Sequence, residues 1–282
     1  MSNAVAIRSI FHPSDFSEAS EIAFVHALKL ALVAKASLSM LHVTAGSKAG
    51  WQDFPGVRDT LERWKLVPQG SPKSAVGKLG IDIQKILMSS RDPVKACLNC
   101  LAKHPADLIV LAVRHREGRM RWLERSVGEP MSRRAGQITL FLPHRTKGFV
   151  SRRDGSVRLR SILIPLAKKP RAQPAMEATV RLIRNFQLSA GAVTCLHVGS
   201  ARATRLVKLP ATPGWTWNCV SKTGEPAETI LETAAEVAAD LIVMTTDGPD
   251  GFLDGLRGTT SERVLRKARC PVANLPAGSM LG

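Results

Sequence analysis

The sequence predicts an α/β protein built from two tandem copies of one parallel-sheet domain. The first observation is an internal repeat, because Ile7–Pro13 (I-R-S-I-F-H-P) matches Leu159–Pro165 (L-R-S-I-L-I-P) at an offset of 152 residues. The second is that short apolar runs alternate with helical patterns in each copy, which is typical of a parallel sheet covered by helices on both faces. The third is length, because 282 residues correspond to two domains of about 150 residues each.

Three further blocks recur in the same order in both halves. The matching pairs are Leu41–Val43 with Leu196–Val198, Asp92-Pro93 with Glu225-Pro226, and Asp107–Val110 with Asp240–Val243. The offset changes from 155 to 133 residues only in the middle of the copy. We therefore interpret the chain as a duplicated domain.

The elements of the first copy follow from local patterns. Apolar residues recur at helical spacing over Glu18–Ala34, with Ser14 or Ser17 as the N-cap, and Pro93 is a good first-turn residue for a second helix ending near Lys103. β-rich apolar runs predict strands at Ser9–His12, Ser37–Val43, Ile81–Leu87 and Leu108–Val113.

The second copy repeats this order. Its expected strands are Ser161–Ile164, Ala192–Val198, Thr216–Val220, Leu241–Met244 and Val272–Leu275. The region around 144–156 is rich in Arg, Lys, Gly and Ser, which indicates a connection between domains. We therefore expect domains at 1–146 and 157–282, joined by a linker at 147–156.

Composition narrows the class of protein. Hydrophobic residues make up 44% and charged residues 22%, as in ordinary globular domains. The sequence shows no apolar run of the roughly 18 residues that a membrane helix needs and no secretory leader pattern. The five cysteines do not form a disulfide pattern. We expect a reduced, soluble, cytoplasmic protein without membrane contact.

The net charge of +17 is unusual, and both halves share it. Up to residue 150 there are 22 basic and 12 acidic residues, and 18 and 11 follow. Such a field favours polyanions or acidic partners, although a solvated basic surface is the plainer interpretation.

Residues Pro13–Ser20 (P-S-D-F-S-E-A-S), after the first expected strand, resemble the P-T-D-F-S-E-A-S opening of the universal stress protein family. The resemblance continues in both copies and covers nearly the whole chain, through Leu41–Val43, Glu225–Ala227, Asp240–Met244, Gly258–Leu265 and Ala268–Val272. The chain looks like a tandem member of that family.

This resemblance implies a fold and a site. The implied fold is a five-stranded parallel sheet of order 3-2-1-4-5 in each copy, like that of the adenine nucleotide alpha hydrolases, with the copies packed as an internal pseudo-dimer. In nucleotide-binding members, an Asp after the first strand contacts adenosine, and a G-x2-G-x9-G-[ST] segment after the fourth strand holds the phosphates. Glycines let the backbone approach phosphate, and the N–H groups of the following helix donate to it.

The first copy keeps only part of this pattern. Asp15 and Val43 stand at the adenosine positions, and Ser126 ends the phosphate segment. Ala112, His115 and Arg125 replace its three glycines, so we interpret Asp15, Val43 and Ser126 as a vestigial site. The Arg-rich stretch 114–134 could bind an anion through side chains or form a solvated surface.

The second copy keeps the other part. Thr245-x2-Gly248-x9-Gly258-Thr259 has the family's spacing and two of its three glycines, and Thr259 and Thr260 open a helix. Ala167 replaces the Asp. The expected nucleotide-binding residues of this copy are Pro165, Val198, Met244, Thr245, Gly248, Gly258, Thr259 and Thr260. Lys168 and Lys169 could add charge near a phosphate, and the glycine loop could equally be an inherited turn without a ligand.

Other candidate residues favour packing over chemistry. Cys97 and Cys100 fall within a predicted helix without a second cysteine or histidine pair, so we expect buried small residues and no metal. His42 and His197 recur as scaffold positions. Trp51, Trp64 and Trp122 could stack on bases, but no nucleic-acid motif accompanies them.

Together these features predict a stress-response binding or regulatory module with a residual ATP, ADP or phosphate site in the second copy, and with Mg only if ATP is bound. The alternative is a scaffold without nucleotide that recruits an acidic protein or polyanion through its basic surface. We expect no catalytic residues, because no general base is apparent and Ala167 removes the nearest carboxylate; a slow ATPase is the less favoured view. The tandem chain could also form a further homodimer.

Overall fold

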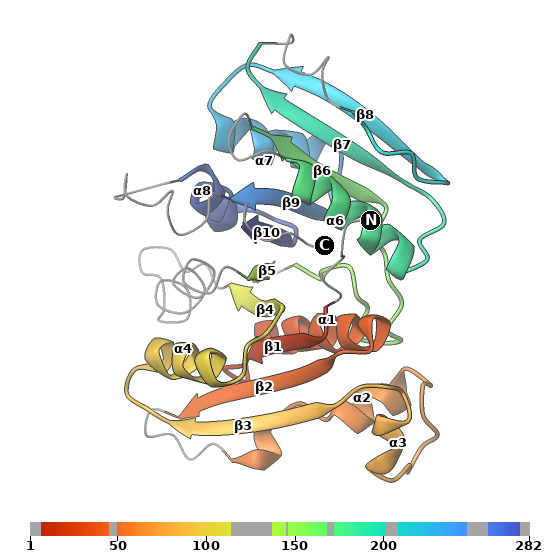
Figure 1. Cartoon of the computed structure of the whole chain (residues 1–282), viewed down its shortest axis with the longest axis vertical. Helices are drawn as coiled ribbons and strands as arrows, with labels where there is room; N and C mark the ends of the chain where they lie inside the picture. The colour runs from red at the N-terminus through yellow and green to blue at the C-terminus, as the bar shows by residue number, and fades with distance from the viewer. Residues whose placement is uncertain are drawn as a thin grey trace. The chain divides into compact units, whose positions relative to one another are not determined.

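The structure is a computed structural model (Figure 1), and it describes residues 7–44, 50–113, 137–144, 146–167, 172–200, 208–246 and 259–276. The chain divides into two compact units, Ala6–Val157 and Arg158–Gly282. We call them the N-terminal and the C-terminal unit. Each contains a parallel sheet flanked by helices, so the predicted α/β class is confirmed.

The N-terminal unit has the strand order β3-β2-β1-β4-β5, with every neighbouring pair parallel. This is the expected 3-2-1-4-5 order. Its elements are β1 (Ser9–Pro13), α1 (Glu18–Ala34), β2 (Ser37–Thr44), the 3-10 helix η1 (Trp51–Asp53), α2 (Val57–Arg63), α3 (Ser74–Gly77), β3 (Ile83–Ser89), α4 (Pro93–Lys103), β4 (Leu108–Val113) and β5 (Ile138–Pro143).

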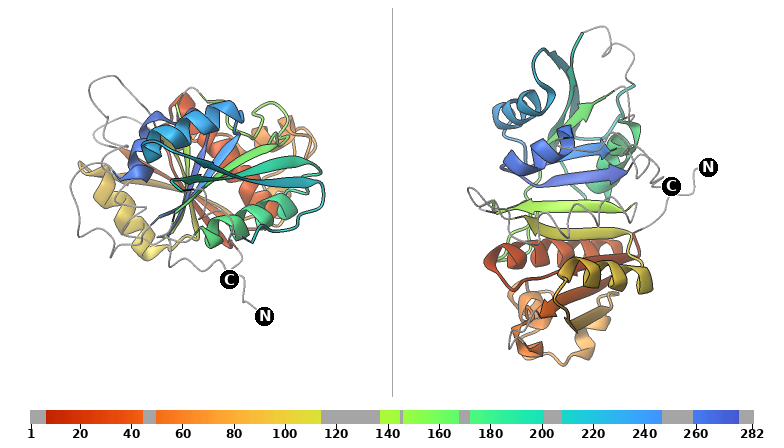
Figure 2. Two further views of the ribbon diagram at one scale, coloured as in Figure 1. Left: turned by 90° about the horizontal axis from the view of Figure 1, so that it is seen from above. Right: turned by 90° about the vertical axis from the view of Figure 1, so that its left-hand side faces the viewer.

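The C-terminal unit repeats this order as β8-β7-β6-β9-β10, again all parallel. Helices α6 and α7 lie on opposite sides of its sheet (Figure 2). Its elements are β6 (Ser161–Leu166), α6 (Gln173–Asn185), β7 (Gly191–Val198), β8 (Trp215–Lys222), α7 (Pro226–Glu236), β9 (Leu241–Thr246), α8 (Thr260–Lys267) and β10 (Val272–Pro276). The pairing of the two units as a pseudo-dimer stays a prediction.

The middle of the copy is where the two units differ. The connection between β2 and β3 consists of residues 45–82 and includes η1, α2 and α3, whereas the shorter connection between β7 and β8 consists of residues 199–214. This difference accounts for the change in repeat offset.

The repeated sequence blocks meet in space and hold each unit together. Asp107 Oδ2 accepts hydrogen bonds from the backbone N–H groups of Arg8 and Ser9 at 2.8 and 2.9 Å. Asp240 Oδ2 accepts the equivalent bonds from Arg160 and Ser161 at 2.7 and 2.9 Å. The Asp before the fourth strand therefore fastens the start of the first strand in both copies.

The segment predicted as a linker packs on the N-terminal unit. Phe149 and Val150 are 2% and 1% exposed, and their N–H groups donate to Nε2 of His26 in α1 at 3.0 and 3.1 Å. Val150 and Val157 then form an antiparallel bridge. We call residues 147–157 the strap.

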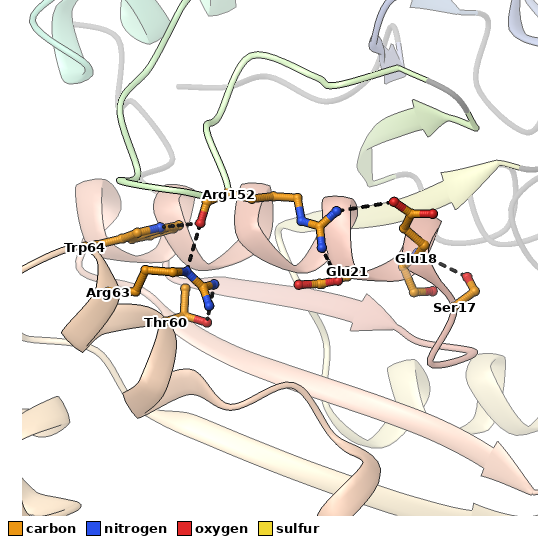
Figure 3. Close-up of polar contacts among 8 residues, drawn as sticks. Ser17, Glu18, Glu21, Thr60, Arg63, Trp64 and Arg152 are labelled. Atoms are coloured by element: carbon orange, nitrogen blue, oxygen red, sulfur yellow. Dashed lines mark hydrogen bonds and ion pairs between the residues drawn. The ribbon is translucent and has the colours of Figure 1, made fainter. Parts of the chain in front are cut away.

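Arg152 ties the strap to two helices (Figure 3). Its guanidinium pairs with Glu18 at 3.4 Å and Glu21 at 2.5 Å on α1. Its carbonyl oxygen accepts from Nε of Arg63 at 3.0 Å and from Nε1 of Trp64 at 3.3 Å. Trp64 is 5% exposed because the strap covers it, so its ring is not available to stack on bases.

Candidate functional site

In the N-terminal unit, Asp15 follows β1 and turns toward the start of α1. Its Oδ1 accepts from the hydroxyl of Ser17, from the N–H of Ser17 at 3.0 Å and from the hydroxyl of Ser20 at 2.7 Å. Ser17, one of two predicted N-caps, caps α1 by accepting from Ser20 N–H at 3.2 Å. This carboxylate oxygen therefore organises the helix N-terminus.

A row of aromatic rings, which no local sequence pattern predicts, occupies the same edge of the sheet. Phe16 stacks on His42 with centroids 3.8 Å apart and planes at 15°, and it meets Phe54 edge-on at 5.0 Å. Phe54 in turn stacks with Trp51 at 5.9 Å. Phe16 adopts a positive φ of 59°, a backbone state that residue type alone does not signal.

The two repeated histidines join the ends of neighbouring strands. Nδ1 of His42 lies 2.7 Å from the carbonyl oxygen of Ser14, and Nδ1 of His197 lies 3.4 Å from that of Leu166. A ring N–H donating to a carbonyl fixes the tautomer, so these contacts support a scaffold role. Val43 is 6% exposed at the end of β2.

In the C-terminal unit, strand register brings several predicted residues to one edge of the sheet. Pro165 pairs with Leu196, and Leu166 with His197, so Val198 lies just beyond the end of β6. Met244 and Thr245 occupy the carboxyl-terminal half of β9, next to β6.

The side chains of these β9 residues differ in what surrounds them. Met244 is 5% exposed and belongs to the hydrophobic cluster that contains Val264 of α8, so its side chain is committed to the core. The Oγ1 atom of Thr245 is buried and has no hydrogen-bond partner among the described residues. Buried polar groups are normally paired, so we expect this hydroxyl to have a partner outside the described residues, such as a water molecule or a ligand.

Helix α8 begins at Thr260, as the sequence predicts. Thr259 is its N-cap, and its hydroxyl accepts from the N–H of Glu262 at 3.2 Å. Arg263, one turn on, pairs with Glu225 at 2.5 Å and with Glu228 at 3.7 Å on α7. The three carboxylates at the first turns of α7 and α8 are thus all paired, because Glu262 also pairs with Arg266.

Several predicted residues lie outside the described part of the chain. They are Ser126, Trp122 and the Arg-rich stretch 114–134 of the first copy, and Lys168, Lys169, Gly248 and Gly258 of the second. The described ends of the phosphate segment are therefore Thr245 and Thr259.

The paired cysteines of α4 are buried, as expected. Cys97 and Cys100 are 2% and 4% exposed, and burial raises the pKa of both thiols, to about 12 for Cys97. Among the described residues no group of three or more His, Cys, Asp or Glu side chains is placed to hold a metal ion. No described helix is long and apolar enough to cross a membrane.

Comparison with known proteins agrees with this architecture. The model of the universal stress protein family matches residues 6–137 and 201–276. A universal stress protein of Methanocaldococcus jannaschii is 49% identical over 49 residues, so the match spans 17% of this chain and only 29% of that protein.

Two solved structures share the fold over nearly the whole chain. A universal stress protein from Archaeoglobus fulgidus has a TM-score of 0.62 at 19% identity and covers 95% of this chain and 98% of its own. A putative universal stress protein from Pseudomonas aeruginosa has a TM-score of 0.59 at 14% identity, with 96% and 94% covered. Together with the family match across both copies, the repeated sheet order shows that this chain belongs to the universal stress protein family.

Proposed function

We propose that the chain is a binding and regulatory module whose C-terminal unit holds an adenine nucleotide or a phosphate group. One observation carries the proposal: β9 ends at Thr246 and α8 begins at Thr260, so the segment with Gly248 and Gly258 runs from a strand's carboxyl end to a helix N-terminus. Such a connection at the edge of a parallel sheet is a general anion-binding arrangement. The hydroxyl of Thr245, which has no hydrogen-bond partner in the described ranges, supports a ligand at this edge.

The adenosine side of this site is weaker than its phosphate side. Ala167 follows β6 where the first copy has Asp15, so this position offers no carboxylate. We therefore propose binding with low selectivity for the base, and binding rather than catalysis, because the position also supplies no general base.

Carboxylates at the N-termini of α7 and α8 affect which form of the nucleotide can bind. Glu225, Glu228 and Glu262 lie in or beside the first turns of α7 and α8. The three carboxylates outnumber the two arginines that pair with them, Arg263 and Arg266, so they disfavour a bare triphosphate. Mg²⁺ bound together with ATP would offset this repulsion.

The test is calorimetric titration of the full chain with ATP, ADP and inorganic phosphate. We compare Thr260→Glu with Thr260→Gln, because both preserve a helix-forming first turn but only the glutamate adds a negative charge beside the phosphates. We expect about one nucleotide per chain, with affinity lowered about tenfold or more in Thr260→Glu and nearly unchanged in Thr260→Gln. Gly258→Arg, which copies Arg125 of the first unit, should also lose binding.

Two results would count against the proposal. If the titration shows no saturable heat of binding up to millimolar nucleotide, the proposed site does not exist. Equal affinities in Thr260→Glu and Thr260→Gln would place the ligand elsewhere.

A second candidate function is recruitment of an acidic partner through the basic surface. The +17 charge of the chain favours this function. Asp15 agrees with it, because its Oδ1 accepts hydrogen bonds from Ser17 and Ser20 at the start of α1 and is therefore already used within the N-terminal unit. Titration with poly-glutamate at several salt concentrations tests this function, because binding through surface charge weakens steeply as salt rises.

A further inference from the structure

Cys195 and Cys219 face each other across neighbouring strands of the C-terminal unit. They are directly paired in the register of β7 and β8, and both are free thiols. Registered residues of parallel strands point to the same face of the sheet, and the strands lie about 4.8 Å apart. This spacing falls within the Cα–Cα range of about 4.4–6.8 Å that disulfides span.

The two thiols lie on the sheet face opposite α7. Leu196, Val198 and Val220 pack with residues of α7 in one hydrophobic cluster. Cys195 and Cys219 occupy the alternate positions of the same strands, so their side chains point the other way. Cys195 is 0% exposed, whereas Cys219 is half-buried.

The position of β8 makes a bond between these residues feasible. β8 is the last strand in the order of its unit, and within the described part of the chain β7 is the one strand with which it forms a ladder. An edge strand that is hydrogen-bonded on one side can shift to bring two Cβ atoms to the roughly 3.5–4.5 Å that a disulfide requires. A disulfide formed with some strain is also easily reduced, which is typical of regulatory rather than permanent bridges.

We propose that Cys195 and Cys219 form a reversible disulfide on exposure to peroxide, which fastens the edge strand β8 to β7. The thiolate of Cys219 attacks one peroxide oxygen, the O–O bond breaks, and a sulfenic acid and one water form. The sulfur of Cys195 then attacks the sulfenic sulfur, the S–O bond breaks, and the oxygen leaves as a second water. Two thiols lose two electrons in total, and one hydrogen peroxide becomes two waters.

Burial sets the conditions for this reaction. Desolvation raises the pKa of Cys219, and it raises that of Cys195 to about 12, so little thiolate is present at neutral pH. Because the thiolate is the reactive form, the rate of oxidation should climb with pH.

The test is oxidation of the full chain with hydrogen peroxide at about pH 8.5, followed by denaturation, alkylation and peptide mass spectrometry. We expect a product that has lost two hydrogen atoms, in which three of the five cysteines are alkylated and dithiothreitol restores all five. A linked Cys195–Cys219 peptide should disappear in Cys219→Ser. It should persist in Cys97→Ser, the matched control from the buried pair in α4.

A second variant tests the order of the steps. In Cys195→Ala the sulfenic acid on Cys219 has no partner, so dimedone should label Cys219. Alkylation of all five thiols after oxidation, or a bridge between other cysteines, would overturn the proposal. Dimedone on Cys270 but not Cys219 would do the same.

Discussion

Two buried histidines show how single side chains depend on their protonation state. His12 and His26 are both 0% exposed, and burial lowers the pKa of each from 6.5 to about 4. Nδ1 of His26 donates to the carbonyl of Ile22 at 2.7 Å, which leaves Nε2 as the acceptor for Phe149 and Val150. A proton on Nε2 would face two N–H donors, so the strap requires neutral His26.

The stability of the chain should therefore fall in mild acid. Between pH 6.5 and about 4 the imidazole of His26 is protonated in the unfolded chain but neutral in the folded chain. The free energy of unfolding therefore decreases as the pH falls through this range. Below about 4 both states carry the proton and the effect of this group levels off. The loss from His26 is at most about 3 kcal/mol.

Urea unfolding at a series of pH values checks this expectation. His26→Gln keeps a side-chain acceptor that does not titrate, so its free energy of unfolding should vary less between pH 6.5 and 4 than that of the native chain. Identical pH profiles would show that His26 does not link the strap to pH.

At the scale of elements, the strap depends on glycines that leave room for its neighbours. Gly155 has a φ of +68°, and a Cβ atom there would lie 2.5 Å from Cδ2 of Trp64. Gly70 has a similar φ of +73°, yet a Cβ atom there would meet nothing within 4 Å. An alanine at either position would have the same unfavourable positive φ, but only at Gly155 would its Cβ atom also clash with Trp64.

We expect Gly155→Ala to destabilise the chain by about 2–4 kcal/mol and Gly70→Ala by about 1 kcal/mol. Thermal unfolding of both variants measures the difference, and only Gly155→Ala should alter tryptophan fluorescence. Equal losses would mean that the strap does not press on Trp64.

Local signals were sufficient for the starts of α1 and α8. Ser17 and Thr259 cap helices α1 and α8 where the sequence places them, because an N-cap bonds to a residue only three positions away. The strap is different. Its composition resembles an open linker, but its anchor, His26, lies 123 positions before Phe149 in the chain.

At the scale of the whole molecule, the duplication lets one unit serve as the control for the other. Ala167 and Asp15 occupy equivalent positions after the first strand of each copy. If the C-terminal unit binds nucleotide, Ala167→Asp should raise affinity for ATP relative to inorganic tripolyphosphate by about tenfold, because the new carboxylate can accept hydrogen bonds from the nucleoside. Calorimetry with both ligands measures this ratio.

The matched change in the first copy is Asp15→Ala, which should leave the ratio unchanged. An equal gain for both ligands in Ala167→Asp would show that the carboxylate does not contact the nucleoside. A change of the ratio in Asp15→Ala would place a nucleotide in the N-terminal unit.

The repeated blocks and the starts of α1 and α8 could be predicted from residue patterns, because each depends on a motif of few residues. The strand order of both sheets is the one that the family resemblance implies. The surroundings of individual side chains could not. Met244 in the core, Trp64 under the strap and the rings around Phe16 are set by contacts between residues far apart in the chain. Such contacts depend on close packing, in which the position of each side chain depends on the shapes of all its neighbours. The residues next to it in the sequence therefore do not predict them.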